Sequence, residues 1–119
     1  SLDKPFFNPP GWIFAPMWTT LYVLIGIAGW RVFTLINDTT IRLLWIAQMI
    51  LNFLWSPAFF GGQSTLMGLV VIIPMLLVIL SFIIRAWRIE RVSAYLFLPY
   101  AAWVSFASVL NAALHVLNS

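Results

Sequence analysis

Three polar side chains at helical spacing are the residues of this chain best placed to bind a ligand or a neighbouring helix. Gln48, Asn52 and Ser56 follow one another at intervals of four within a long apolar run, so they share one face of a predicted helix. Amides in apolar surroundings must find hydrogen-bond partners. They either bond across helices or line a cavity that holds water or a polar ligand group, and the residues alone leave both interpretations open.

Aromatic residues accompany the polar ones on three predicted helices. Trp45 and Trp55 lie on or beside the amide face of the second run. Two further runs mix aromatic, small and polar residues at intervals of three and four, namely Trp18, Tyr22, Gly26 and Gly29, and then Tyr100, Trp103, Ala107, Asn111 and His115. Indole and phenol rings supply flat apolar area with one polar group each, and small residues leave space beside them. This combination predicts a site for a flat, largely apolar ligand.

Other kinds of site lack the residues they need. The only carboxylates, Asp3, Asp38 and Glu90, fall outside the apolar runs, so no acid and base can be buried together. His115 has no second ligand three or four residues away, and the chain has no cysteine. We therefore expect no catalytic residues of the ordinary acid–base or nucleophilic kind, no metal site and no bound cofactor.

The composition indicates a membrane protein. Charged residues make up 8% of the 119 residues and hydrophobic ones 63%, whereas soluble domains carry about a quarter charged residues. Apolar runs cover 12–36, 43–60, 66–84 and 92–117, and each reaches the roughly 17 to 25 residues that a membrane-spanning helix needs. The prediction is an all-α, polytopic transmembrane bundle with four helices and a single domain over residues 1–119.

Basic residues predict how the bundle is oriented. Arg31 and Arg42 flank the first connection, whereas Arg85, Arg88 and Arg91 occupy the third. Lys and Arg in short loops prefer the cytoplasmic side, so both termini should face away from the cytoplasm. The net charge of +3 follows from this bias, and we expect no nucleic-acid partner because no basic patch with stacking aromatics forms.

Two further patterns have simple structural interpretations. Tryptophan is enriched at membrane surfaces as an anchor, which is the expected role of Trp12, Trp30, Trp45 and Trp87 near the ends of their runs. Ser64 and Gly68 form a small-xxx-small pair of the kind found where membrane helices dimerise. A homodimer is therefore compatible with the sequence, although this pattern is also common by chance.

Several segments resemble one family of membrane proteins. The stretch Lys4 to Trp12 (KPFFNPPGW), continued by Pro16-Met17-Trp18 and Leu21-Tyr22, is similar to the first loop and second helix of the translocator protein family. These proteins are also called tryptophan-rich sensory proteins or peripheral-type benzodiazepine receptors (TspO/MBR). Residues 48–61 resemble the third helix of that family, and residues 99–111 resemble its fifth. The resemblance runs nearly end to end.

The resemblance implies a fold, a ligand and a site. Family members are five-helix bundles, often dimers, that bind porphyrins and haem-related tetrapyrroles, synthetic isoquinoline and benzodiazepine ligands and, in some members, cholesterol. The four predicted helices would correspond to helices 2–5. By matching positions, the implied ligand-binding residues are Pro9, Phe14, Trp18, Tyr22, Asn52, Trp55, Ser56, Trp103 and Ala107. The light-dependent porphyrin breakdown reported for the family would fall to Trp18 and Trp103.

Two departures from the family pattern shape these expectations. The first family helix is missing, because the chain begins in the loop that should follow it, and we expect an incomplete chain rather than a true four-helix member. The cholesterol pattern of animal members, a Tyr followed by a basic residue, is replaced after Asn111 by Ala-Ala-Leu-His-Val. This argues against high-affinity sterol binding and favours a bacterial-type receptor or carrier for tetrapyrroles, in a bacterial cell membrane or outer membrane. The alternatives are a structural scaffold and a photochemical enzyme.

Overall fold

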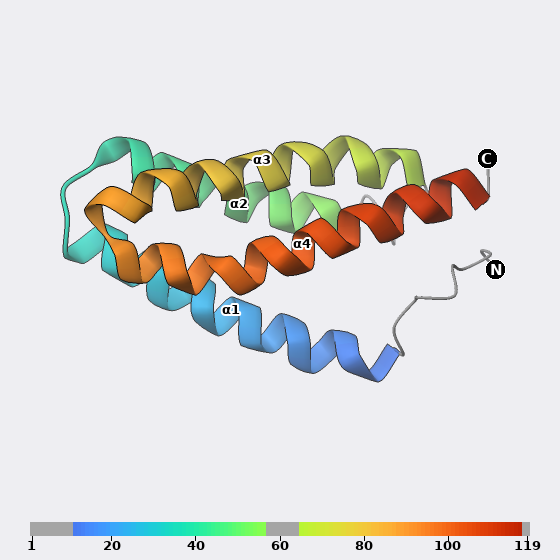
Figure 1. Ribbon diagram of the computed structural model, residues 1–119, viewed down its shortest axis with the longest axis horizontal. Helices are drawn as coiled ribbons and strands as arrows, with labels where there is room; N and C mark the ends of the chain where they lie inside the picture. Colours follow the sequence, from blue (N-terminus) through green and yellow to red (C-terminus); the bar gives the residue numbers. More distant parts are fainter. Residues whose placement is uncertain (1–10, 57–64, 118–119) are drawn as a thin grey trace.

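The described part of the chain folds as a bundle of four α-helices. The computed structural model describes residues 11–56 and 65–117, apart from the side chains of residues 11, 14, 56 and 65. The helices are α1 (Gly11–Thr34), α2 (Thr39–Ser56), α3 (Thr65–Ile89) and α4 (Arg91–Leu117). They run up and down along the long axis of the molecule (Figure 1), which measures 47 Å against 25 and 21 Å for the shorter axes.

Helix lengths and surfaces fit a membrane. At about 1.5 Å per residue, α2 is about 27 Å long and α4 about 40 Å, against a hydrocarbon core of about 30 Å. Leu66–Ile89 and Arg91–Leu117 are each long and apolar enough to cross it. Large apolar side chains also cover the outer surface, such as Val70, Ile84 and Val109, each at least 60% exposed. The predicted all-α transmembrane bundle is therefore confirmed.

Acidic residues decide where two helices begin. Asp38 accepts a hydrogen bond from the backbone N–H of Ile41 at 2.8 Å, and Glu90 accepts one from that of Ser93 at 3.2 Å. Each carboxylate thus caps the free N–H groups of a first turn. The cap at Asp38 starts α2 at Thr39, four residues before the apolar run at Leu43, because capping compensates for the polar first turn.

The third connection is shorter than the sequence predicts. Arg85 and Arg88 lie in the last turns of α3, and only Glu90 separates α3 from α4. The expectation that these arginines occupy a loop is wrong, because arginine favours helix as strongly as leucine does. Its long side chain also reaches water from within a helix.

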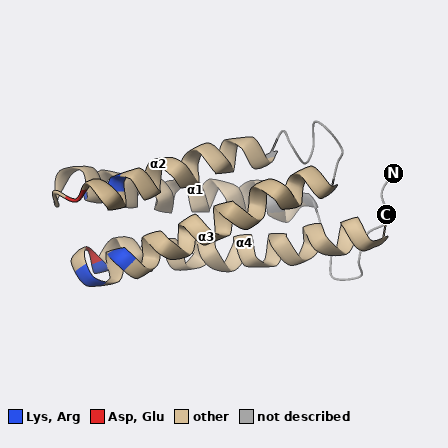
Figure 2. Ribbon diagram, turned by 90° about the horizontal axis from the view of Figure 1, so that it is seen from above, with Lys and Arg blue, Asp and Glu red and all other residues tan. Residues whose placement is uncertain are grey.

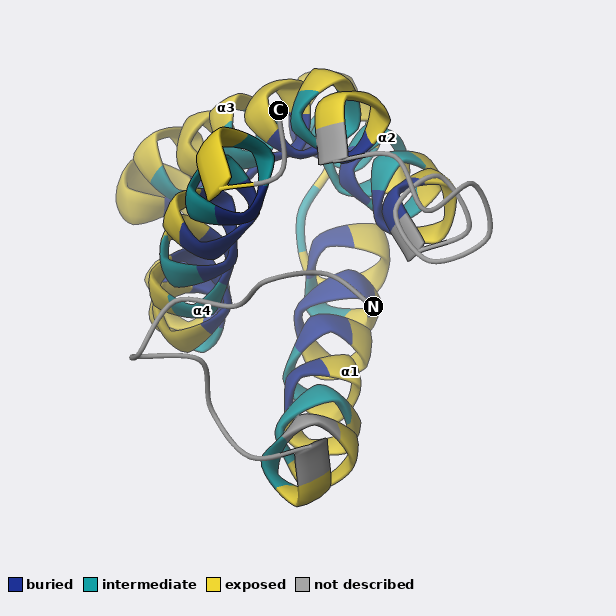
Figure 3. Ribbon diagram, turned by 90° about the vertical axis from the view of Figure 1, so that its right-hand side faces the viewer, coloured by how far each residue is buried: buried dark blue, intermediate teal, exposed yellow. Residues whose placement is uncertain are grey.

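Packing is uneven around the bundle. Contact is most extensive between α3 and α4, then between α2 and α3 and between α1 and α4, and it is sparse between α1 and α2. Phe82 of α3 stacks on Phe97 of α4 with ring centroids 4.0 Å apart. Buried residues face the interior of all four helices, and α1 stands apart from α2 in the end view (Figure 3). The α1–α2 boundary is therefore the least tightly closed side of the bundle.

Charged residues of the described segments gather at one end, where α1 meets α2 and α3 meets α4 (Figure 2). Arg31 of α1 pairs with Glu90, and Arg85 of α3 pairs with Asp38 at 2.9 Å. Each carboxylate thus caps one helix and holds the end of another. At the opposite end, α1 diverges from α4 toward its N-terminus (Figure 1).

Candidate ligand-binding seam between helices α1 and α2

A chain of hydrogen bonds crosses the middle of the bundle. The Tyr22 hydroxyl of α1 donates to Asn52 Oδ1 of α2 at 2.7 Å. Asn52 Nδ2 donates to the Tyr100 hydroxyl of α4 at 2.8 Å, and that hydroxyl donates to Gln48 Oε1 at 2.8 Å. Gln48, Asn52 and Tyr100 are buried. The network therefore links three helices at a depth where water cannot replace the bonds.

Aromatic rings continue this contact toward the uncharged end of the bundle. Trp18 lies one turn before Tyr22 on α1, with ring centroids 5.7 Å apart. It also lies 6.3 Å from Trp55 of α2, with the two ring planes tilted by 33°. Trp18, Tyr22, Asn52 and Trp55 together form what we call the α1–α2 seam. Here long side chains, rather than close backbones, hold the two helices together.

Helix α4 lies behind the seam. The Trp55 indole N–H donates to Asn111 Oδ1 of α4 at 3.3 Å, so α2 reaches α4 both there and at Tyr100. The backbones of α2 and α4 do not approach one another anywhere in the described segments. Trp103 and Ala107 fall between Tyr100 and Asn111 on the same face of α4. Trp103 is partly buried against the core and Ala107 is 7% exposed.

A second contact closes the seam toward the charged end. Trp45 of α2 packs over Gly29 of α1, and its indole N–H donates to the backbone oxygen of Ile25 at 3.0 Å. A Cβ atom at Gly29 would lie 2.7 Å from the Trp45 ring, so only glycine admits this ring. Trp45, expected as an anchor at the membrane surface, thus uses its indole nitrogen between helices.

The structure brings most of the expected site residues to one region. Trp18 contacts both Tyr22 and Trp55, and Tyr22 bonds to Asn52. Trp103 and Ala107 share the α4 face that lies behind them. Three positions cannot be compared: Pro9 lies outside the described residues, and the side chains of Phe14 and Ser56 are not described. Ser64 of the expected dimer pair also falls outside them.

The site list from the sequence omitted Gln48, Tyr100 and Asn111, which complete the polar contacts. Two properties could have identified them: their depth in the bundle, and the need of buried amides and hydroxyls for hydrogen-bond partners. A buried tyrosine hydroxyl needs a partner, and Gln48 and Asn52 are the buried amides of α2. Counting residues inward from the charged end places Tyr100 about 14 Å along α4 and Gln48 about 15 Å beyond Asp38. Matching the depths of polar residues on different helices would have paired them.

Asp38 and Glu90, the carboxylates of the described residues, lie at the charged end of the bundle, away from the seam. A hydrogen bond from Arg85 holds the pKa of Asp38 below its ordinary value. A hydrogen bond from Arg31 likewise lowers the pKa of Glu90. Both carboxylates are thus charged at neutral pH and occupied by arginines. The seam itself offers flat aromatic faces, amides and hydroxyls, which suit binding rather than acid–base chemistry.

This fold and site define a class: a polytopic α-helical membrane protein with an aromatic and amide face enclosed by three helices. The model of the TspO/MBR family matches residues 1–117 of the chain. The chain belongs to the TspO/MBR family.

Individual relatives agree with this assignment. The tryptophan-rich protein TspO of Archaeoglobus fulgidus is 42% identical over 121 residues, covering 100% of this chain and 78% of the relative. The tryptophan-rich sensory protein of Cereibacter sphaeroides is 34% identical over 111 residues, covering 93% and 70%. The translocator protein of Homo sapiens is 30% identical over 116 residues, covering 93% and 69%.

Proposed function

We propose that this protein is a membrane receptor or carrier that binds a tetrapyrrole, such as a porphyrin, in the α1–α2 seam. It would serve tetrapyrrole handling or stress sensing, and the same seam would take synthetic isoquinoline or benzodiazepine ligands. One observation carries the proposal. Trp18, Tyr22 and Trp55 lie ring against ring across two helices whose backbones make sparse contact.

The physical reason lies in the shape and mobility of the seam. A planar macrocycle gains dispersion and apolar burial when it lies against indole and phenol faces. Tyr22 is 40% exposed, so part of the aromatic surface is accessible before a ligand arrives. Because α1 packs mainly on α4, a small displacement of α1 from α2 makes room for a flat ring without dismantling the α3–α4 core.

Similarity to relatives supports a receptor or carrier role. Relatives bear the names translocator protein and tryptophan-rich sensory protein, and these names suggest movement or sensing of a ligand. The missing animal cholesterol pattern favours a tetrapyrrole ligand and a bacterial cell membrane.

The test is a titration of protoporphyrin IX into the protein in lipid nanodiscs, followed by the shift of the porphyrin absorbance band. We expect Trp18→Phe combined with Trp103→Phe to weaken binding about 5- to 150-fold, since each aromatic contact is worth about 0.5 to 1.5 kcal/mol beyond its area. Trp30→Phe is the matched control. It changes a tryptophan of the same helix α1 that is 59% exposed, and it should bind as the wild type does.

Unchanged affinity and unchanged photoproduct in the double variant would show that the assigned pocket is wrong. The scaffold alternative rests on the network at Asn52, which already bonds to two tyrosines. It requires Asn52→Ala to lower stability in detergent without a selective loss of porphyrin affinity. The photochemical alternative requires turnover, with more than one porphyrin consumed per protein under light and the product released.

A further inference from the structure

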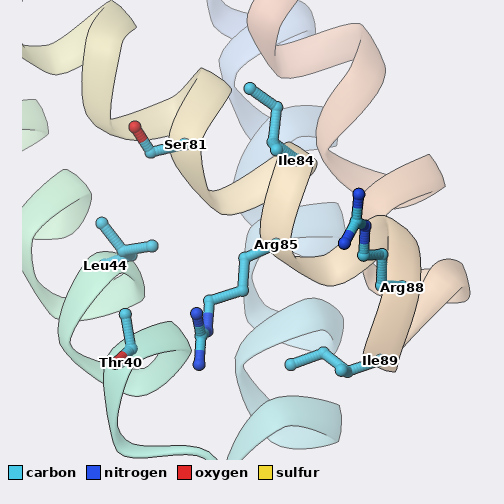
Figure 4. Close-up of a pocket in the computed structure, with 7 residues that line it drawn as sticks. All are labelled: Thr40, Leu44, Ser81, Ile84, Arg85, Arg88 and Ile89. Atoms are coloured by element: carbon cyan, nitrogen blue, oxygen red, sulfur yellow. The ribbon is translucent and has the colours of Figure 1, made fainter.

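A groove on the outer surface lies between α2 and α3, at the charged end of the bundle and away from the α1–α2 seam. Its volume is about 720 Å³. Its lining residues are Thr40, Leu44, Ser81, Ile84, Arg85, Arg88 and Ile89 (Figure 4). The lining changes character along the helices. Leu44 and Ile84 form an apolar wall, and the arginines of α3 follow closer to the end of the helix.

Positive charge is left over at this end of the groove. Arg85 reaches from α3 toward α2 (Figure 4) and is neutralised by a two-pronged pair with Asp38, at 3.0 and 2.9 Å. Arg88 follows one turn later, is exposed, and has no ion pair within residues 11–56 and 65–117. In Figure 4 its guanidinium points in another direction from that of Arg85. An exposed arginine changes rotamer in nanoseconds, so Arg88 can turn toward a phosphate in the groove.

The groove has an apolar wall on a membrane-facing surface, and this wall ends at an arginine without an ion-pair partner among the described residues. These two parts match the acyl chain and the anionic headgroup of a lipid. We propose that this groove binds an anionic phospholipid, with an acyl chain against Leu44 and Ile84 and the phosphate held by Arg88 beside Arg85. Arginine donates paired hydrogen bonds to phosphate. Basic pockets between membrane helices on the cytoplasmic side bind acidic lipid headgroups, and the charge bias predicts that this end faces the cytoplasm.

A lipid fits these observations better than a soluble anion does. Ile84 is 70% exposed and lies in the apolar part of α3, where a hydrocarbon chain can cover it. A free phosphate or phosphorylated metabolite would use the arginines and leave this wall unused. The placement of Thr40 in the first turn of α2 adds a hydroxyl donor and the positive end of a helix.

The experiment measures binding of a phosphatidylglycerol by the full chain in detergent micelles, with native mass spectrometry counting bound lipids and thermal unfolding reporting stabilisation. Phosphatidylcholine with the same acyl chains is the lipid control. We expect one tightly retained phosphatidylglycerol, and about a fivefold loss of affinity in Arg88→Gln. Arg91→Gln removes the same charge outside the groove and should stay within about twofold of the wild type.

A second variant tests the acyl half of the site. Ser81→Trp fills the groove without altering charge, and the Ser81 hydroxyl donates to the Leu77 carbonyl of its own helix. It should also weaken phosphatidylglycerol binding. Equal losses in Arg88→Gln and Arg91→Gln would overturn the proposal in favour of diffuse charge attraction. Competition by inorganic phosphate at the same concentration, or equal retention of phosphatidylcholine, would overturn it as well.

Discussion

The contact between Gly29 and Trp45 gives the sharpest test of how α1 and α2 are held together. Replacing Gly29 by alanine adds one Cβ atom, which would lie 2.7 Å from ring atoms Cε2 and Cζ2 of Trp45. The ring cannot turn away freely, because its nitrogen is bonded to the Ile25 carbonyl at 3.0 Å and its other side meets Phe33 edge to face. Either the helices separate or the indole leaves its place.

The magnitude follows from three terms. Overpacking of this kind costs about 1 to 3 kcal/mol, and a lost indole hydrogen bond costs about 0.5 to 1.5 kcal/mol more. Against these losses, replacing glycine by alanine within a helix stabilises the helix by about 1 kcal/mol. We therefore expect Gly29→Ala to destabilise the protein by about 0.5 to 3.5 kcal/mol. In a chain of this size such a change lowers the unfolding midpoint by several degrees.

Gly26 is the matched control, one turn earlier on the same helix, where an added Cβ meets nothing within 4 Å. Gly26→Ala should be neutral or stabilising by up to about 1 kcal/mol. Thermal unfolding in detergent, followed by circular dichroism, compares the two variants. Trp45→Leu should remove most of the difference between them. Equal midpoints for Gly26→Ala and Gly29→Ala would refute the close contact of the Trp45 ring with Gly29 described above.

Two further predictions concern the polar groups. Asn52→Leu removes both bonds to Tyr22 and Tyr100 and should lower the free energy of unfolding by about 1 to 3 kcal/mol. Tyr22→Phe removes one of these bonds and should lower it by less. Equal losses in the two variants would argue against a connected network. Glu90 has a lowered pKa because Arg31 donates to it, so its contribution is complete above its ordinary pKa of 4.5 and is lost as the pH falls below that value. Unfolding midpoints between pH 7 and pH 3 should therefore fall less in Glu90→Gln than in the wild type, and parallel curves would contradict this assignment.

Much of the fold could be predicted because hydrophobic runs and helix length are local properties. The run 92–117 gave α4 to within one residue. The predicted helix boundaries were wrong at the start of α2 and the end of α3, because the length of an apolar run does not account for helix capping or for charged residues that favour helix. Asp38 extends α2 backward through a cap, and Arg85 and Arg88 continue α3 beyond its apolar part because helix propensity and solvated guanidinium groups permit it.

The candidate site was harder to predict in full. Spacing alone placed Gln48 and Asn52 on one face, and the structure confirms that both are buried. Which helix supplies their partners depends on how the four helices are arranged around the bundle axis. The spacing of residues along one sequence gives the face of a helix but not which helix lies against that face. The Trp45–Gly29 contact shows the same limit, since its specificity arises from the Trp45 ring lying directly against the backbone of α1 at Gly29.

The placement of both ion pairs at one end has a mechanical consequence. Arg31 and Glu90 fix the C-terminal end of α1, and α1 spans 24 residues, or about 36 Å, from there to its start. A tilt of only about 5° about that pivot swings the far tip sideways by about 3 Å over this length. Trp18 lies in the part of α1 that moves farthest, and Trp45 lies near the pivot. Tilting of α1 therefore widens the gap between helices at the aromatic end and leaves the helix contacts at the arginine end unchanged.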